Sequence, residues 1–135
     1  MNAQETMRWG CLMSGLADDL QFVRALFEGS ALKVHYGKQF QKNLKKVLRN
    51  PIAAKKLPGI LSEIENTGRS TVGGTHTIGN APNFRSDLTG NVEMNWIVVP
   101  VSMKDDIRVM FKFFPDLNAV EIRGVGRAEE IGYKH

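Results

Sequence analysis

Apolar and polar residues alternate along residues 105–127 in the pattern of a β-hairpin. The alternating apolar positions are Ile107, Val109, Phe111 and Phe113, followed by Val120 and Ile122. A turn is predicted over residues 115–118, because Pro presets φ and Asp and Asn side chains hydrogen-bond to the local backbone. One face of the hairpin can therefore close a hydrophobic core. The other presents Arg108, Lys112 and Arg123, either as an ordinary solvated face or as fixed cations for a polyanion.

Apolar residues recur at helical spacing along residues 5–28, which predicts an amphipathic N-terminal helix. The stripe consists of Trp9, Leu12, Met13, Leu16, Leu20, Val23 and Phe27. We expect this helix either to pack on the core or to mediate dimerisation. Cys11 adjoins the stripe and is interpreted as a small buried apolar residue.

A short strand followed by two helices is predicted next. Residues 32–36 alternate as a strand, and residues 38–48 carry apolar side chains on one helical face. Asn50-Pro51 has the form of a helix N-cap followed by proline in the first turn. The second helix is expected to run to about Asn66, with Pro58 kinking or restarting it.

Residues 69–91 form a long segment rich in Gly, Thr, Asn and Ser, which is typical of a functional or disordered loop. A short strand is expected within it at Thr75–Ile78. A central strand is predicted over residues 92–102, because its residues from Trp96 to Val101 are nearly continuously apolar, and Pro100 is expected at an edge or a bulge. The chain is thus predicted to be α+β. We expect an antiparallel sheet of about four strands packed on two helices in residues 31–135, preceded by a helical extension in residues 1–30.

Composition narrows the class of protein. The chain has 135 residues, which favours one domain, and a single cysteine, which excludes an internal disulfide and argues against a cysteine-based metal site. Its net charge of +4 favours an anionic partner, with nucleic acid first, acidic protein second and membrane surface third. No apolar run reaches transmembrane length, and Asp18 and Asp19 interrupt any signal-peptide pattern. These features predict a cytoplasmic protein without a membrane partner.

Basic residues are concentrated in one part of the chain. Residues 29–62 contain no Asp or Glu, and residues 38–49 carry cations on the polar side of the predicted helix. Like charges at this spacing destabilise a helix, so an anionic ligand is the economical explanation, with nucleic acid preferred and an acidic protein as the alternative. The candidate nucleic-acid contacts are Lys38, Lys42, Lys45, Arg49, Arg85, Lys112, Arg123 and Arg127.

The order of elements and three short motifs resemble the RelE/HigB/ParE superfamily of toxins from toxin–antitoxin systems, over residues 32–135. Ile107–Phe113 looks like the arginine-bearing strand of that family, and Val120–Arg127 looks like its closing strand and glycine turn. Lys38–Leu48 resembles its first helix, and Thr75–Ile78 is similar to a histidine-bearing strand of HigB-like members. The resemblance implies a small RelE-like fold.

The resemblance further implies a metal-independent endoribonuclease, acting on mRNA (on the ribosome) and neutralised by a protein antitoxin. In such enzymes the RNA 2′-hydroxyl attacks the adjacent phosphate and leaves a 2′,3′-cyclic phosphate. By position, Arg108 would contact the scissile phosphate, and Arg127 lies beside the family's glycine-turn arginine. Tyr133 and His135 match its C-terminal general acid, base or stacking group, and His76 would supply the other proton-transfer group.

Three alternatives stay open. ParE-like members share the fold but poison a host enzyme without cleaving RNA, so the fold alone does not decide the function. A delivered toxin of the same fold group would cleave tRNA. A small basic RNA-binding module without chemistry is the plainest alternative. A single loop histidine such as His76 is more often a surface residue than a catalyst, and a terminal triplet such as Tyr133–His135 is often frayed.

Overall fold

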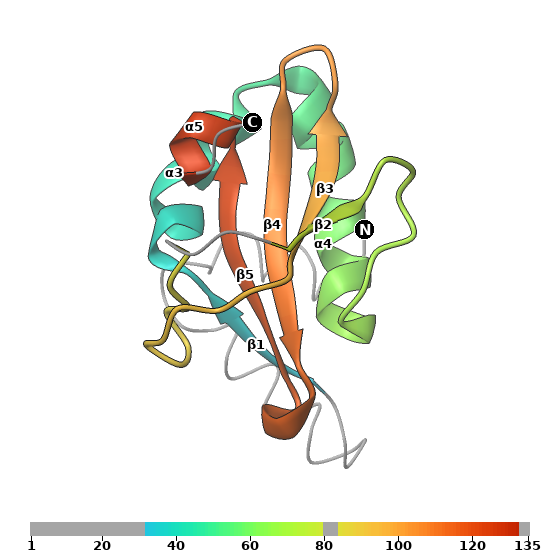
Figure 1. Cartoon of the computed structure of the whole chain (residues 1–135). Helices are drawn as coiled ribbons and strands as arrows, with labels where there is room; N and C mark the ends of the chain where they lie inside the picture. The colour runs from blue at the N-terminus through green and yellow to red at the C-terminus, as the bar shows by residue number, and fades with distance from the viewer. Residues whose placement is uncertain (1–31, 80–83, 133–135) are drawn as a thin grey trace.

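The computed structural model describes residues 32–79 and 84–132, and in this part the protein is α+β (Figure 1). The predicted N-terminal helix, Tyr133 and His135 lie outside the described residues. The elements are β1 (Lys33–Tyr36), α3 (Lys38–Leu48), α4 (Pro51–Thr67), β2 (His76–Ile78), β3 (Trp96–Ser102), β4 (Ile107–Phe114), a 3₁₀ turn (Pro115–Leu117), β5 (Ala119–Gly126) and α5 (Ala128–Ile131).

One sheet holds all five strands in the order β1-β5-β4-β3-β2. The strands β2 to β5 form an antiparallel meander, as predicted, but β1 pairs with β5 in parallel, from Lys33 opposite Ala119 to Tyr36 opposite Ile122. The sheet is therefore mixed, and the prediction of a purely antiparallel sheet was wrong. The helices α3 and α4 carry the chain to the far edge, and the meander returns so that β5 runs beside β1 in the same direction.

The two helices begin and end close to their predicted limits. The Asn50 side chain accepts hydrogen bonds from the backbone N–H groups of Ile52 and Ala53, both at 3.0 Å, and so caps α4. Pro58 lies within this continuous helix and does not restart it. The missing proline N–H leaves the carbonyl of Ala54 unpaired within the helix, and Ala54 is exposed to water.

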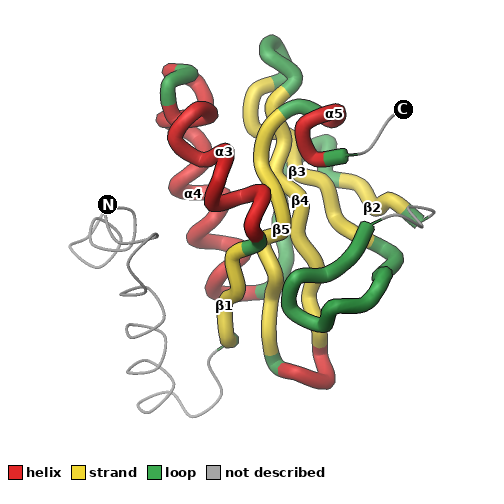
Figure 2. The backbone as a smooth tube through the Cα atoms, turned by 90° about the vertical axis from the view of Figure 1, so that its left-hand side faces the viewer, coloured by secondary structure: helices red, strands yellow, loops and turns green. Residues whose placement is uncertain are grey.

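Apolar side chains pack on both faces of the sheet, and Figure 2 shows α3 and α4 on one side and the loop after β2 on the other. The larger core lies under the helices and includes Phe40, Leu57, Ile64, Val109 and Phe111. A smaller cluster on the opposite face consists of Phe84, Trp96, Val98, Met110 and Ile131. The face expected to present Arg108, Lys112 and Arg123 is therefore partly covered by apolar residues.

The hydrogen-bond register of the sheet shifts at two positions, which changes the direction of the side chains there. The register between β3 and β4 shifts between Pro100 and Ser102, which confirms the bulge expected near Pro100. A second shift lies between Met110 and Phe111 of β4, which pair with Gly124 and Ile122 of β5. Arg123 is therefore the extra residue of β5 at this bulge. The strand β3 begins later than predicted, at Trp96, because Asn95 has a left-handed backbone with φ 64°.

Substitution of two glycines in the α4 region tests the backbone conformation directly. Gly68 ends α4 with φ 70°, and a Cβ atom there would lie 2.8 Å from Phe113 Cδ1. We expect Gly68→Ala to destabilise the protein by at least ~1–2 kcal/mol, the cost of a left-handed conformation for an L-residue. Gly59 lies inside α4 with open space around it, so Gly59→Ala should stabilise by ~0.5–1 kcal/mol. Urea denaturation of both variants measures this, and a destabilising Gly59→Ala or a neutral Gly68→Ala would contradict the backbone described.

Candidate nucleic-acid interface

His76 and Arg108 lie on the same face of the sheet. His76 pairs with Val98, which in turn pairs with Met110, and both of these side chains belong to the smaller apolar cluster. Arg108 precedes Met110 by two residues on β4, so its side chain points to the same face. The two residues are separated by two interstrand spacings across the sheet and by two residues along the strand direction. Their Cα atoms therefore lie about 12 Å apart. One RNA strand lying across β3 could therefore contact both residues.

The His76 side chain is exposed on the edge strand β2. Its Nδ1 lies 3.2 Å from the carbonyl oxygen of Gly74. When Nδ1 carries the proton it donates to this carbonyl, and Nε2 then has the lone pair that a general base requires. The contact with the Gly74 carbonyl thus orients the imidazole within the local turn.

The Arg108 guanidinium is largely covered and forms an ion pair with Asp106. Asp106 has a left-handed backbone with φ 57° in the turn between β3 and β4, which directs its carboxylate back along β4. A phosphate would have to share the guanidinium with this carboxylate or displace it.

The described chain ends at Gly132, beside the face that carries His76 and Arg108. Ile131 of α5 packs against Met110 and Trp96, and Gly132 ends the helix with φ 102°. The predicted catalytic residues Tyr133 and His135 follow this point directly but lie outside the described residues.

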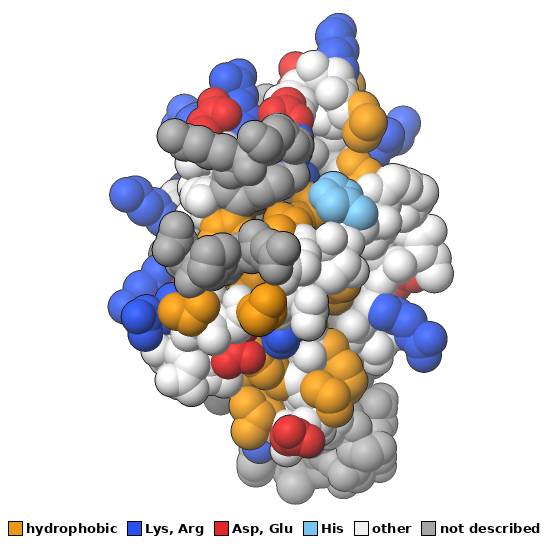
Figure 3. Space-filling model, viewed as in Figure 1, with side chains coloured by type: hydrophobic (Ala, Val, Ile, Leu, Met, Phe, Trp, Pro, Cys, Tyr) orange, Lys and Arg blue, Asp and Glu red, His pale blue; other side chains and the backbone are white. Residues whose placement is uncertain are grey.

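The cations predicted on α3 are all exposed, and in Figure 3 basic side chains project from the side of the molecule where α3 lies. They are Lys38, Lys42, Lys45, Lys46 and Arg49. Phe40, Leu44 and Val47 form the buried face of the same helix. Lys46 is paired with Glu130 of α5, and this hydrogen bond, with one from the Arg127 backbone N–H, lowers the pKa of Glu130. Arg127, which is exposed, lies close to the same Glu130 carboxylate.

The predicted RNA contacts on β4, β5 and the long loop have partners within the protein. The Arg123 guanidinium lies 4.9 Å from the centre of the Phe84 ring and 5.7 Å from that of Trp96, and it donates hydrogen bonds to the carbonyls of Arg85 and Ile131. Burial lowers the pKa of Arg123, while the carboxylates of Asp87 and Glu121 oppose that shift. These contacts hold the loop and α5 on the sheet.

Lys112 and Arg85 are also engaged. The Lys112 ammonium donates to the Met94 carbonyl and lies 3.9 Å from the Glu93 carboxylate. Arg85 donates to the Gly90 carbonyl at 2.6 Å, although its side chain remains exposed. Of the predicted RNA contacts, those on α3 and Arg127 are the most accessible to a ligand.

Glu121 is a fully buried carboxylate that the sequence pattern did not reveal. It accepts hydrogen bonds from Ser86 Oγ at 2.5 Å and from the backbone N–H groups of Asp87 at 3.0 Å and Leu88 at 3.3 Å. Asp87 in turn accepts a hydrogen bond from the Lys38 backbone N–H at 2.8 Å. Glu121 thereby fixes the loop against β5 and the start of α3.

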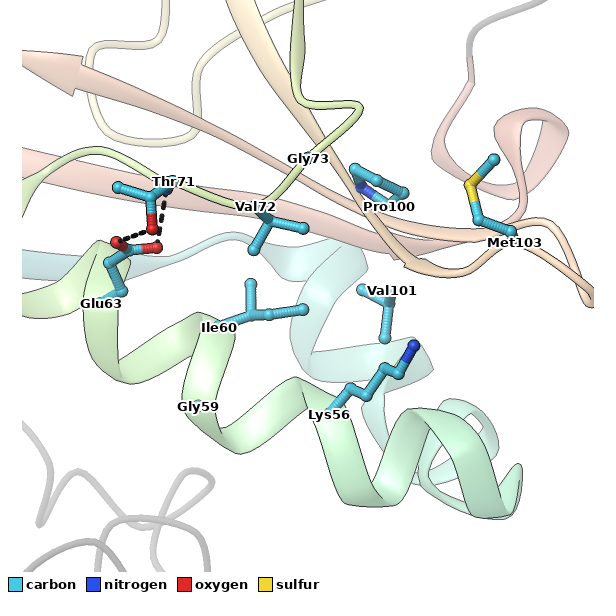
Figure 4. A pocket seen from close by; sticks show the side chains of 10 residues that line it. All are labelled: Lys56, Gly59, Ile60, Glu63, Thr71, Val72, Gly73, Pro100, Val101 and Met103. Atoms are coloured by element: carbon cyan, nitrogen blue, oxygen red, sulfur yellow. Dashed lines mark hydrogen bonds between the residues drawn. The ribbon is translucent and has the colours of Figure 1, made fainter.

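Two grooves lie beside α4. The first, the Met103 groove, has a volume of about 540 Å³ and lies between α4 and the segment before β2 (Figure 4). Ile60, Val72 and Val101 give it an apolar floor. At one end the Glu63 carboxylate accepts hydrogen bonds from Thr71, which lower the pKa of Glu63. None of the residues predicted for the site lines this groove.

The second, the Phe113 groove, has a volume of about 380 Å³ beyond the C-terminal end of α4. Its lining includes Gly68, Arg69, Thr75, Asn95 and Phe113. Lys112 is the one predicted site residue that borders it.

The described residues contain no group of three or more His, Cys, Asp or Glu that could hold a metal ion, and none of the helices described is both long and apolar enough to cross a membrane. Comparison with known proteins gives no match to a family model, to a curated protein or to a solved structure.

Glu121→Gln tests the role of the buried carboxylate. The amide offers one acceptor oxygen in place of two and brings an N–H₂ group that needs acceptors of its own, so we expect a loss of ~1–3 kcal/mol in the free energy of unfolding. Glu129→Gln removes the same charge from an exposed position on α5 and serves as the control. Urea denaturation compares the two, and equal stability of both variants would contradict the anchoring role of Glu121.

Proposed function

We propose that this protein is a metal-independent endoribonuclease of the RelE/HigB type, which cleaves mRNA on the ribosome and is neutralised by a protein antitoxin. The observation that carries the proposal is the placement of His76 and Arg108 on one face of the sheet, the face against which Ile131, one residue before the end of the described chain, is also buried. The sequence resemblance supports it independently.

In the proposed reaction the 2′-oxygen forms a bond to phosphorus while the bond from phosphorus to the 5′-oxygen breaks. A base takes the proton of the 2′-hydroxyl, and an acid protonates the leaving 5′-oxygen, which leaves a 2′,3′-cyclic phosphate and a 5′-hydroxyl. His76 would act as one of these two groups, and Tyr133 or His135 as the other. Arg108 would stabilise the charge that develops on the phosphate oxygens.

The exposed cations of α3 would hold the RNA backbone beside this site. α3 and its C-cap Arg49 carry five basic residues, and residues 29–62 contain no acidic one. Like charges one helical turn apart repel each other, and an RNA phosphate chain would offset that repulsion. The pairing of Lys46 with Glu130 is the one ion pair between these five cations and a carboxylate within the described residues.

Incubation of purified protein with RNA and with translating ribosomes in EDTA tests the proposal. We expect cleavage to persist in EDTA and to yield 2′,3′-cyclic phosphate ends. His76→Ala, Arg108→Ala and His135→Ala should each lower the rate by ~10²-fold or more if the side chain acts on the reacting atoms. His35→Ala on β1 is the matched control. RNA that stays intact with and without ribosomes would refute the proposal.

A second prediction concerns α3. We expect Lys38→Gln/Lys42→Gln/Lys45→Gln to weaken RNA binding and to reduce the slope of log K against log salt by ~0.7 for each phosphate that the variant no longer neutralises. Lys33→Gln/Lys55→Gln/Lys104→Gln removes the same charge from exposed lysines on other elements. Binding titrations at several salt concentrations give both slopes, and equal slopes for the two variants would contradict an RNA-binding role for α3.

The ion pair between Arg108 and Asp106 favours a second candidate, a non-catalytic poison of a host enzyme as in ParE-like members, because a paired guanidinium is less available to a phosphate. Asp106→Asn distinguishes the two. It keeps a residue that tolerates the left-handed backbone and removes the competing charge. The nuclease proposal requires tighter RNA binding by this variant, whereas a poison would leave RNA whole and induce DNA-damage signalling on expression.

A further inference from the structure

We propose that the Phe113 groove binds one nucleobase of single-stranded RNA and so determines the sequence preference of the protein. This inference rests on the proposed function, since it assigns a substrate-recognition subsite to the same RNA. The groove lies on the helix-covered face of the sheet, beyond the end of α4, and its volume is about 380 Å³.

The first observation is a half-exposed aromatic ring beside a cation. Phe113 is 37% exposed, although its neighbours on the same face, Val109 and Phe111, are buried. Gly68 lies against the ring on one side, where even a Cβ atom would be only 2.8 Å from it. Arg69, directly after this glycine, is exposed and borders the same groove. Aromatic rings and arginine planes are the surfaces on which proteins stack unpaired RNA bases.

The second observation is a hydroxyl group without a partner. Thr75 borders the groove, and its Oγ1 is buried and makes no hydrogen bond among the described residues. A buried hydroxyl is rarely left unpaired, and rotation about the Cα–Cβ bond moves it to another staggered position. Asn95 borders the groove as well and adds an amide with both a donor and an acceptor. These groups can read the edge of a base, which an apolar docking site would not require.

The third observation is the position of the groove relative to His76. Thr75 immediately precedes His76, and β2 is an edge strand, so the groove and the imidazole lie on opposite faces of the same edge. An RNA strand that passes over this edge would place a base in the groove and a neighbouring phosphate beside His76. The groove would then read a nucleotide next to the cleaved bond.

The four ribonucleoside 5′-monophosphates, with ribose 5-phosphate as the compound lacking a base, test the subsite by NMR titration of the full chain. We expect one base to bind most tightly and ribose 5-phosphate to bind at least ~10-fold more weakly. Phe113→Leu, which keeps an apolar side chain, should weaken nucleotide binding by ~10-fold. Met103→Ala, which removes an exposed side chain from the Met103 groove, should have no effect.

Thr75→Val replaces the unpaired hydroxyl by a methyl group of similar shape. We expect it to reduce the difference in affinity between the bases while leaving the protein at least as stable in urea as the wild type. Equal affinity for all four nucleotides and ribose 5-phosphate would overturn the subsite, as would an unchanged affinity in Phe113→Leu.

The outcomes separate the subsite from the nuclease. Nucleotide binding that depends on Phe113, in a protein that leaves RNA intact, supports the subsite and refutes the proposed reaction. RNA cleavage with the same sequence preference in the wild type and in Phe113→Leu overturns the subsite and leaves the reaction standing.

Discussion

The arrangement of this protein depends on how α3 completes the open edge of β5. The strand β1 is short and pairs with β5 only from Ala119 to Ile122, so within residues 32–79 and 84–132 the far half of that edge has no neighbouring strand. Two side chains of α3 take its place. Gln39 accepts a hydrogen bond from the Val125 N–H at 2.8 Å and donates to the Val125 carbonyl, to which Asn43 also donates at 2.7 Å. An unpaired strand edge is thereby satisfied by amides rather than by another strand.

These hydrogen bonds also decide which side of α3 faces solvent. Gln39 and Asn43 lie one turn apart and fix the helix against β5, where Gly124 and Gly126 leave room for their amides. The rotation of the helix about its axis is then determined, and its lysines must point outward. An exposed basic face is therefore a consequence of the same packing that closes the sheet.

The helices and the hairpin could be predicted from the sequence because their signals are local. The α3 stripe, the Asn50 cap and the turn at residues 115–118 each lie within a few residues of the structure they produce. The second face of the sheet could not be predicted in this way. Phe84 and Ile131 are distant in sequence from the strands they cover, and Glu121 and Arg123 look like ordinary outward positions of an alternating strand. The fold of residues 84–95 over the sheet buries Glu121 and brings the Arg123 guanidinium over the rings of Phe84 and Trp96.

The same limit applies to the candidate site. The sequence alone could single out Arg108 and His76 as candidates, because an arginine on a strand and an imidazole in a polar segment are visible as residue types. It did not show that Asp106 would hold the guanidinium, which requires the left-handed turn before β4. That ion pair matters for any anion that binds here. A phosphate that displaces the carboxylate gains less than one that meets an unpaired guanidinium, and it leaves Asp106 beside the bound phosphate with its charge uncompensated. Binding and charge at this site are therefore coupled, and the energetics of Arg108 have to be considered together with those of Asp106.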